Sequence, residues 1–562
     1  MQTELASLRE EFDAVRTQLR EVLKLNELMR ADLDRRNAPE PPPHKPERVP
    51  PEQLQLAMAR VLAESGAEAS GNDDGEGDDD EDAPDDRDPP RDAGGARPAR
   101  KPSKRRRLDL TKLPVQEVVL DPDEVIAAHG EGFRPMGQEV SERLAFRPGT
   151  FLRLRLVRRK WAAVETSEAA SLALAHDESA SEAAPEPAVV IAPVPDGVWP
   201  RVMADPSAVA HHIVSKYEDC LPLHRQEKIT TRQGFCVPRG SQCGWLQEAF
   251  RYLYRIVDAM LEDARTNAFC IATDATGAPV RAKGERECAR HHVFVFVADQ
   301  RHVIFRHAPE HTGRTVRTWL GGFRGYLLAD ASSIYDVIYR QGAVVEVGCW
   351  AHLRRYFWRA LLSAPERATE AIALIGRLFE IERECATMAL PERTKARARR
   401  ARPVLKLLDD WVSRHRGEAD PRSPLHAALT YYANQREALR RFLVDGRLRL
   451  DNNVSEGQLR RLVLGRANWT YFANATGLDW YVVFRSLIAS CHLHGLNPQT
   501  YLEQVLRLVP HWPQTRVLEL APDRWPQTAA RLTPDQRAIV TPPWELDRVV
   551  RPREASTGEV AA

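Results

Sequence analysis

The stretch from Phe269 to about residue 360 constrains the fold most, because short apolar runs in it alternate with helical patterns. Phe269 to Asp274 is predicted to be a strand that ends in a carboxylate. Two further strands, His292 to Val297 and His302 to Phe305, are predicted to form a hairpin around residues 298–301. The stretch therefore opens with three strands.

The same stretch continues with alternating helices and strands. The predicted elements are a helix from Arg314 to Leu320, a strand from Gly325 to Asp330, a helix from Ser332 to Tyr339, a strand from Ala343 to Val347 and a helix after Cys349. The order βββαβαβα is that of a ribonuclease H-like core. In that order the ends of the first and fourth strands lie side by side, so Asp274 and Asp330 would be neighbours.

A third carboxylate occurs later, in the stretch Asp451-Asn-Asn-Val-Ser-Glu456. Asn453 is predicted to cap a helix that has Glu456 in its first turn and Leu459, Leu462 and Val463 as its buried stripe. A capping box without catalytic function is the common explanation of this spacing. The same helix carries a basic and aromatic set that suits a phosphate backbone: Arg460, Arg461, Arg466 and Trp469.

Two or three converging carboxylates can hold a pair of Mg²⁺ ions that activate a nucleophile and stabilise the leaving oxygen. Asp274, Asp330 and Glu456 are the predicted set, with Mn²⁺ as an alternative ion. Each acid alone is better explained as a cap or a surface residue. Their joint position on two strand ends and one helix favours a catalytic metal site.

No zinc is expected. The eight cysteines include no Cys-x-x-Cys pair, and Cys349 with His352 supplies only two ligands where a closed structural site takes four. The pair follows the strand next to the one that carries Asp330. We therefore expect the pair to pack beneath the catalytic acids and to orient them, with His352 as a fourth catalytic residue near the metals or a DNA phosphate. The alternative is a buried thiol and a helix-start histidine without catalytic function.

The first third of the chain alternates ordered and linker patterns. Residues 1–37 carry apolar side chains at spacings of three and four, which predicts a dimerising coiled coil, or alternatively a lone amphipathic helix. Residues 38–110 are predicted to be a disordered linker with one helix from Gln53 to Glu64. It contains an acidic block from Asp73 to Asp88 and a basic block from Arg97 to Arg107, the latter a candidate phosphate anchor.

Residues 111–165 alternate apolar and polar side chains as a small β module does, and a second linker is predicted at 166–198. Residues 199–262 are predicted to form three short helices with a glycine turn before the third, the layout of a helix-turn-helix. The reading helix would begin with Arg239, Ser241 and Gln242. An all-helical spacer without DNA contact is the alternative.

The ribonuclease H-like core is predicted in two parts, residues 263–363 and a closing part at 445–490. A helical insertion at 364–444 separates them, and residues 491–562 are predicted to be C-terminal helices with a loosely ordered tail. The insertion is rich in arginine, and breaks are predicted near Pro391, Pro403 and Pro421. The fold class is therefore multidomain α/β.

Composition and charge indicate where in the cell the protein works. The 80 basic and 79 acidic side chains nearly balance, but the two signs are segregated along the chain. No run of about 18 apolar residues occurs, and the N-terminus does not read as a signal peptide. We expect a cytoplasmic protein without a membrane partner.

Several stretches together resemble DDE-type transposases of the insertion sequence 66 family. They are Lys216-Tyr-Glu-Asp-Cys-Leu-Pro-Leu-His-Arg-Gln226, Asp274-Ala-Thr276, Gly325-Tyr-Leu-Leu-Ala-Asp330, Cys349-Trp-Ala-His-Leu-Arg-Arg-Tyr-Phe357, Asp451-Asn-Asn-Val-Ser-Glu456, Gly465-Arg-Ala-Asn-Trp469 and Asn497-Pro-Gln-Thr-Tyr-Leu502. The resemblance implies an acid triad that binds Mg²⁺, cleaves at transposon ends and transfers the 3′-ends to target DNA.

The resemblance also implies partners: the inverted-repeat ends, target DNA, a second copy through the coiled coil, and accessory proteins encoded by the same element. It implies a nucleoid-associated protein. The chain departs from the family pattern at Ala275, where an acid is usual, at Ala467, where a lysine is usual, and in the absence of cysteines from residues 113–165. Two alternatives stay open: a domesticated transposase that binds DNA as a dimer without cleavage, and a host nuclease of ribonuclease H-like fold.

Overall fold

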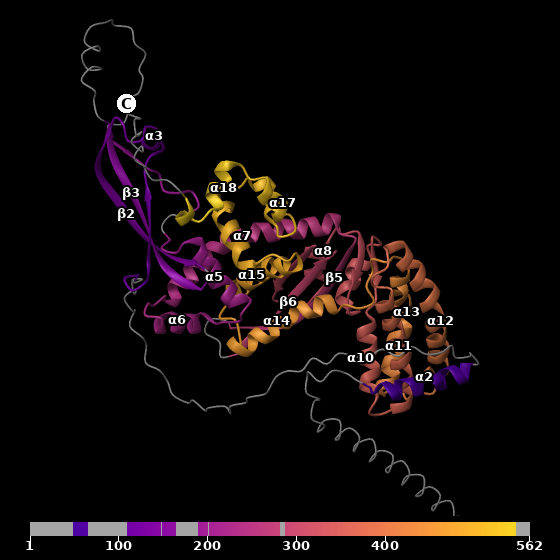
Figure 1. The fold of residues 1–562 in the computed structure, drawn as a ribbon. Helices are drawn as coiled ribbons and strands as arrows, with labels where there is room; N and C mark the ends of the chain where they lie inside the picture. Colours follow the sequence, from indigo (N-terminus) through magenta and orange to yellow (C-terminus); the bar gives the residue numbers. More distant parts are fainter. Residues whose placement is uncertain are drawn as a thin grey trace, which may run out of the picture.

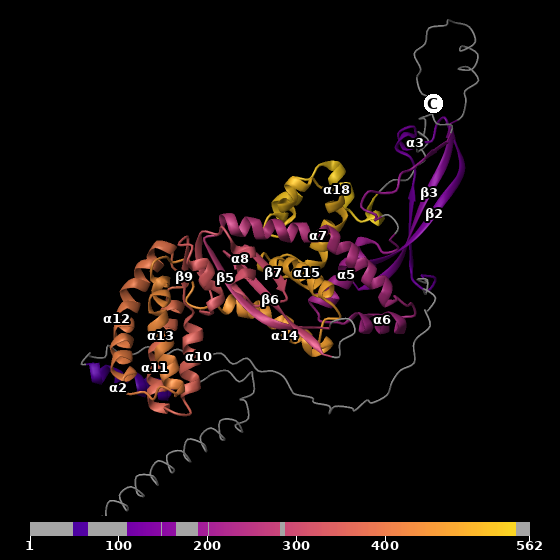
Figure 2. The same ribbon diagram turned by 180° about the vertical axis from the view of Figure 1, so that it is seen from behind.

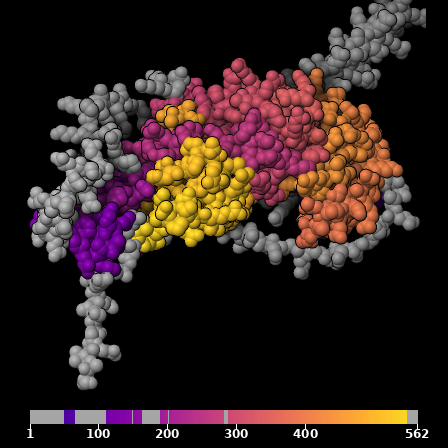
Figure 3. Space-filling model, turned by 90° about the horizontal axis from the view of Figure 1, so that it is seen from above, coloured from indigo at the N-terminus to yellow at the C-terminus, as the bar shows by residue number. Residues whose placement is uncertain are grey.

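The computed structural model describes residues 49–65, 110–147, 149–163, 189–199, 202–281 and 287–546. Figure 1 shows a β module at one end, a sheet with helices in the middle and a helical bundle at the other end, and Figure 3 shows the same order from above. The predicted coiled coil, acidic block and basic block lie outside the described residues.

The β module is a four-stranded sheet built on a long hairpin. Its elements are β1 Val115–Leu120, α3 Asp123–Ala127, β2 Phe133–Arg147, β3 Thr150–Ala163 and β4 Val189–Ile191. β2 and β3 pair antiparallel, and β1 runs parallel to β3. The indole of Trp161 donates to the buried Asp121 carboxylate over 2.8 Å. Because β4 pairs with β3, the predicted linker at 166–198 contributes a strand to this sheet.

Three helices follow: α5 Pro206–Tyr217, α6 Leu223–Arg232 and α7 Arg239–Asn267. The prediction of three short helices is wrong for α7, which has 29 residues. Its buried positions continue at helical spacing as far as Met260 and Ala264. The helix contacts β7 and α15, and Figure 2 shows it lying along the central sheet, so α7 is part of the central domain.

The central sheet has the strand order β7-β6-β5-β8-β9. The strands are β5 Cys270–Arg281, β6 Cys288–Ala298, β7 His302–Ala308, β8 Gly325–Leu328 and β9 Val344–Val347. β6 is antiparallel to both β5 and β7, whereas β8 and β9 continue the sheet parallel to β5. The helices α8 Gly313–Leu320, α9 Asp336–Tyr339 and α10 Trp350–Ala360 follow β7, β8 and β9, which is the predicted order of elements.

The strand β5 is longer than predicted, and Asp274 lies inside it. β5 pairs with β8 only from Cys270 to Ala272, but its pairing with β6 continues to Arg281. Phe472 supports the far end, because its N–H donates to the Pro279 carbonyl and its own carbonyl accepts from the Arg281 N–H, both over 2.9 Å. Phe472 is remote in sequence from β5. The local sequence of residues 275–279, Ala-Thr-Gly-Ala-Pro, therefore did not predict that the strand continues.

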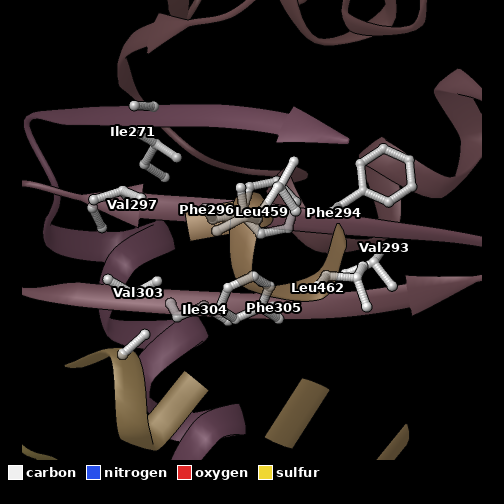
Figure 4. Packing of buried hydrophobic residues seen from close by; sticks show 14 of the residues in the cluster. Ile271, Val293, Phe294, Phe296, Val297, Val303, Ile304, Phe305, Leu459 and Leu462 are labelled. Carbon is white, nitrogen blue, oxygen red and sulfur yellow. The ribbon is translucent and has the colours of Figure 1, made fainter. Parts of the chain in front are cut away.

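Two later helices, α14 Asn453–Trp469 and α15 Ala475–Leu493, close the core. Figure 4 shows Leu459 and Leu462 of α14 in one cluster with phenylalanines of β6. Val463, the third residue of the predicted stripe, is 39% exposed, so that prediction is wrong for Val463. The helix buries the small Ser455 and Gly465 on its inner face, which rotates Val463 outward.

The helix α15 protects the edge of the sheet. Its Ser486 and Ser490 hydroxyls accept hydrogen bonds from the N–H groups of Phe305 and Val303 over 2.8 and 3.0 Å. These N–H groups belong to the edge strand β7 and would otherwise be open to another strand.

The helical insertion forms a bundle beside β9. Its helices are α11 Pro365–Glu384, α12 Leu390–Arg416 and α13 Pro424–Arg440, and α2 Pro51–Ser65 packs on α11 as the predicted short helix. Pro403 does not break the helix there, contrary to the prediction, and lies inside α12. The buried residues Ala401, Val404 and Leu405 flank it, and their packing outweighs the missing backbone hydrogen bond.

Residues 491–546 form helices and turns, so the predicted loose tail is wrong for this described part. Its helices are α16 Pro498–Leu508, α17 Trp525–Ala530 and α18 Pro534–Val540, and its 3₁₀ turns are Val509–His511, Gln514–Leu520 and Pro543–Glu545. Two further 3₁₀ turns occur earlier in the chain, at Ser333–Tyr335 and Arg441–Leu443. Leu520, Trp525 and Leu532 are buried. Over the described ranges, no helix combines the length and apolar character that a membrane crossing needs.

A buried ion pair ties α16 to the start of α5. Arg507 and Asp205 are both fully buried, with Nη1 and Oδ2 3.0 Å apart, and Asp205 also caps α5. We predict that Asp205→Ala lowers the free energy of unfolding by about 3–5 kcal/mol in urea denaturation, because the buried Arg507 guanidinium loses its fully buried partner and keeps only Glu503 as a counter-charge. Removing the exposed partner of Glu248, by Arg251→Ala, should cost less than about 1 kcal/mol. Equal effects of the two changes would contradict the burial of Arg507.

Candidate active site

The register of β5 and β8 brings two of the predicted acids together. Ala272 pairs with Leu328 as the last residue of their parallel ladder, so Asp274 and Asp330 each lie two residues beyond it, at the same level. Both carboxylates are half-buried. The Asp274 Oδ1 accepts from the Ala275 N–H over 2.7 Å, and the Asp330 Oδ1 accepts from the Ser332 N–H over 3.1 Å.

Asn452 fixes the helix that carries the third acid. Its side-chain amide donates to the Thr273 carbonyl over 2.8 Å, and its oxygen accepts from the Ser455 hydroxyl. The helix begins at Asn453, with Asn452 as the flanking residue, so the predicted cap at Asn453 is wrong by one position. Asn453 is exposed and its amide donates to Asp451. The buried Asn452 therefore joins the first turn of α14 to β5 directly beside Asp274.

The three acids influence one another through their charges. The pKa of Asp274 is raised to about 7, mainly by burial, and the charges of Asp330 and Glu456 contribute in the same direction. The Ala275 N–H and Arg355 oppose this rise only in part. A carboxyl whose pKa is perturbed by burial and by two other carboxylates is typical of a functional site.

Two side chains of α10 hold Glu456 from the other side. The Arg355 Nη2 lies 3.2 Å from Glu456 Oε2, and His352 Nε2 lies 3.5 Å from Oε1. Burial lowers the pKa of His352, and the charge of Glu456 opposes this. Sequence reasoning missed Arg355, although it follows His352 at the three-residue spacing that puts both side chains on one helix face.

In the part of the chain that the structure describes, no three His, Cys, Asp or Glu side chains converge closely enough to hold a metal ion. Glu456 Oε1 and His352 Nδ1 are buried without a hydrogen-bond partner among these residues. The acids thus share one region, with Glu456 turned toward α10.

Cys349 and His352 have separate surroundings. The Cys349 thiol is fully buried and accepts from the Asn452 N–H over 3.2 Å, and burial raises its pKa to about 11. His352 faces Glu456. The thiol of the pair is therefore packed in the core, whereas the imidazole lies against an acid of the predicted triad. A catalytic role for His352 stays a prediction.

The candidate DNA-contacting residues of α14 fall into two groups. Arg460 and Arg461 are exposed, and Arg461 lies 3.5 Å from Glu218. Arg466 donates to the Gly277 carbonyl over 2.7 Å, and Trp469 is half-buried with the Lys216 ammonium over its ring. Arg466 and Trp469 hold α14 in place, whereas Arg460 and Arg461 face solvent.

At the start of α7, the candidate residues do not form a reading surface. Gln242 is fully buried and donates to the Val237 carbonyl over 2.8 Å, so it cannot reach a base edge. Ser241 is half-buried. Arg239 is exposed and paired with Glu227 over 2.9 Å. The prediction is wrong for Gln242, because its position lies on the inner face of α7.

The two adjacent asparagines give a direct comparison. We predict that Asn452→Ala lowers the free energy of unfolding by about 1–3 kcal/mol, because the buried Thr273 carbonyl loses its donor. Asn453→Ala, at the exposed neighbour, should stay within about 0.5 kcal/mol. Urea denaturation of both variants measures this, and a larger loss at Asn453 would mean that Asn453 is the cap after all.

Comparison with known proteins gives two family matches. Residues 201–479 match the model of the transposase IS66 family, and residues 486–522 match the IS66 C-terminal element. The matched ranges include Asp274, Asp330, Glu456 and the α16 helix.

Three proteins of Sinorhizobium fredii (strain NBRC 101917 / NGR234) are similar to the chain. Uncharacterized protein y4qI is 28% identical over 331 residues, which cover 56% of this chain and 61% of y4qI. Uncharacterized protein y4hP is 25% identical over 444 residues, covering 74% of this chain and 76% of y4hP. Uncharacterized protein y4jD is 25% identical over 413 residues, which cover 71% of this chain and 77% of y4jD. With both family models matched in chain order, the chain belongs to the IS66 family of transposases.

Proposed function

We propose that the protein is a DDE transposase that binds the ends of its element, cleaves DNA phosphodiester bonds and transfers the 3′-ends to target DNA. Its catalytic centre is a ribonuclease H-like core with Asp274, Asp330 and Glu456 as the acid triad. The observation that carries the proposal is the common level of Asp274 and Asp330 on the parallel strands β5 and β8, beside the first turn of α14.

The donor chemistry fits a divalent cation. The triad consists of carboxylates, which are the ligands that Mg²⁺ prefers, and Glu456 Oε1 is a buried oxygen without a hydrogen-bond partner among the described residues. Bound Mg²⁺, or Mn²⁺ in its place, would activate the nucleophile and stabilise the leaving oxygen. Asp274, Asp330 and Glu456 would hold it, and no zinc is required.

The other residues of the site orient the triad. Asn452 ties α14 to the Thr273 carbonyl, and so limits how far Glu456 can move from Asp274. Arg355 pairs with Glu456 from α10, and His352 lies beside the same carboxylate, so both contacts would have to change if Glu456 turned toward the aspartates. Arg460, exposed one turn after Glu456, is the side chain of α14 best able to contact a phosphate near the triad.

One observation favours a second candidate function. Because Glu456 is engaged by α10 and the described residues include no ready three-ligand set, the chain could be a domesticated transposase that binds DNA as a dimer without cleavage. Inverted repeats that bound the gene would favour an active mobile element, and their absence in a constant gene neighbourhood would favour the domesticated protein.

Cleavage of end DNA tests the triad. We predict that Asp274→Ala, Asp330→Ala or Glu456→Ala each abolishes strand cleavage in Mg²⁺ while DNA binding is largely retained, because the acids and the phosphate-contacting cations are different residues. Gel analysis of labelled end DNA gives cleavage, and a mobility shift gives binding.

The matched control is Asp336→Ala, which removes an exposed acid near Asp330 that pairs with Arg340. It should leave cleavage unchanged. Full cleavage by any triad variant would exclude that residue from the triad, and absence of cleavage by the unchanged protein would favour the domesticated alternative.

His352 is predicted to position Glu456. His352→Ala should reduce cleavage severely while thermal stability and zinc content stay unchanged, because the imidazole faces Glu456 and not the hydrophobic core. Unimpaired cleavage would mean that His352 has no part in the reaction. Stoichiometric zinc in the purified protein, lost with His352, would reveal a metal site that the structure does not suggest.

A further inference from the structure

One face of α12 carries a row of cations that the catalytic centre does not use. The row comprises Lys395, Arg399, Arg402 and Lys406, which we call the α12 stripe. Their spacings of four, three and four residues put all four on one side of the helix, along about 16 Å of its axis. All four side chains are exposed.

The stripe differs from the other cations of the same helix. Arg393 and Arg397 pair with Glu382, and Arg400 pairs with Glu384. The four stripe residues have no ion pair or side-chain hydrogen bond with any described residue. Positive charges that face the bundle are therefore neutralised inside it, and those of the stripe are left for an external partner.

The surface around the stripe is hollowed and has little opposing charge. Stripe residues line two adjoining hollows, one of which also contains Asp409 and Arg440. Asp409 is already neutralised, because Arg436 and Arg440 both bind its carboxylate. Glu392 and Asp410 are exposed near the two ends of the stripe and not within it. An anionic ligand lying along α12 would thus meet four unneutralised cations in a row.

The stripe lies apart from the triad. The helix α12 packs on α11, α13 and α2, and Figures 1 and 2 show it on the side of the bundle away from the central sheet. Contacts of the stripe therefore cannot belong to the reacting phosphodiester bond. They would belong to DNA that extends beyond the cleavage site.

We propose that the α12 stripe binds the phosphate backbone of double-stranded DNA outside the catalytic centre. The proposal rests on the proposed function for its biological purpose, since a transposase must hold end or target DNA on both sides of the reacting bond. Lysine and arginine contacts to phosphates position a duplex without reading its sequence. The stripe is thus a sequence-independent clamp built into the helical insertion.

Charge and composition favour DNA over an acidic protein. Protein interfaces have an apolar or aromatic core and are depleted in lysine. The stripe contains two lysines and two arginines and no aromatic residue. A row of cations without an apolar centre suits the row of charges of a duplex, which carries one phosphate per about 3.4 Å of each strand.

The test is the salt dependence of DNA binding by the full chain. A variant combines Lys395→Gln, Arg399→Gln, Arg402→Gln and Lys406→Gln, and the probe is a fluorescein-labelled duplex of scrambled sequence. Because each lost phosphate contact lowers the slope of log Kd against log salt by about 0.9, we expect the slope to fall by about 3–4. Glutamine supports helices well, so circular dichroism and thermal unfolding should be unchanged.

The matched control exchanges the cations and keeps the charge: Lys395→Arg, Arg399→Lys, Arg402→Lys and Lys406→Arg combined. It should bind with the slope of the unchanged protein. An unaltered slope in the glutamine variant would overturn the proposal, as would an equal loss in the charge-keeping variant. Cleavage of a short end duplex in Mg²⁺ is measured separately: its absence in the unchanged protein would contradict the proposed function, while the binding slope still decides on the stripe.

Discussion

Three residue pairs between β5 and β8 decide where the acids of this protein lie. The parallel register of Cys270 to Ala272 with Tyr326 to Leu328 leaves Asp274 and Asp330 at one level, half-buried and beside α14. This arrangement lowers the stability of the folded state. With its pKa raised from 3.8 to about 7, ionised Asp274 opposes folding increasingly as the pH rises through that range, by on the order of 4 kcal/mol above it. Such a cost is expected where function, and not stability, determines the placement.

The helical insertion can be large because its ends meet. The Gly348 N–H donates to the Ala438 carbonyl over 2.9 Å, and the Trp350 N–H donates to the Leu450 carbonyl over 3.1 Å. The Trp350 indole donates to the Leu439 carbonyl over 2.8 Å. These bonds join the chain that enters the bundle to the chain that leaves it. The bundle therefore adds surface to the protein while α10 and α14 keep their places at the acids.

Local patterns predicted the central elements well, and contacts remote in sequence explain most of the errors. Apolar alternation predicted each strand of the sheet and the order of its helices, because half-buried strands and amphipathic helices show their period directly. The far end of β5, beyond Asp274, is held by Phe472 in addition to β6, and the true start of α14 depends on the Thr273 carbonyl. Neither partner is visible within a local window.

In the candidate site, too, local patterns predicted some residues, whereas others depended on contacts remote in sequence. Strand ends and helix starts were enough to single out Asp274, Asp330 and Glu456, because topology brings such positions together. The role of Arg355 required the three-dimensional contact between α10 and α14. The burial of Gln242 required the full length of α7, whose apolar stripe continues far beyond the turn that suggested a reading helix.

The balance of charges in this chain is informative only when it is resolved by position. The totals of 80 basic and 79 acidic side chains nearly cancel. Inside the bundle the cancellation is real, since Glu382 and Asp409 each bind two arginines. On the outer face of α12 the stripe cations are left unpaired, whereas Asp274 and Asp330 lie at one level on β5 and β8. A polyanion therefore meets attraction along the stripe and repulsion at these two acids, and neutralising the carboxylates would relieve that repulsion.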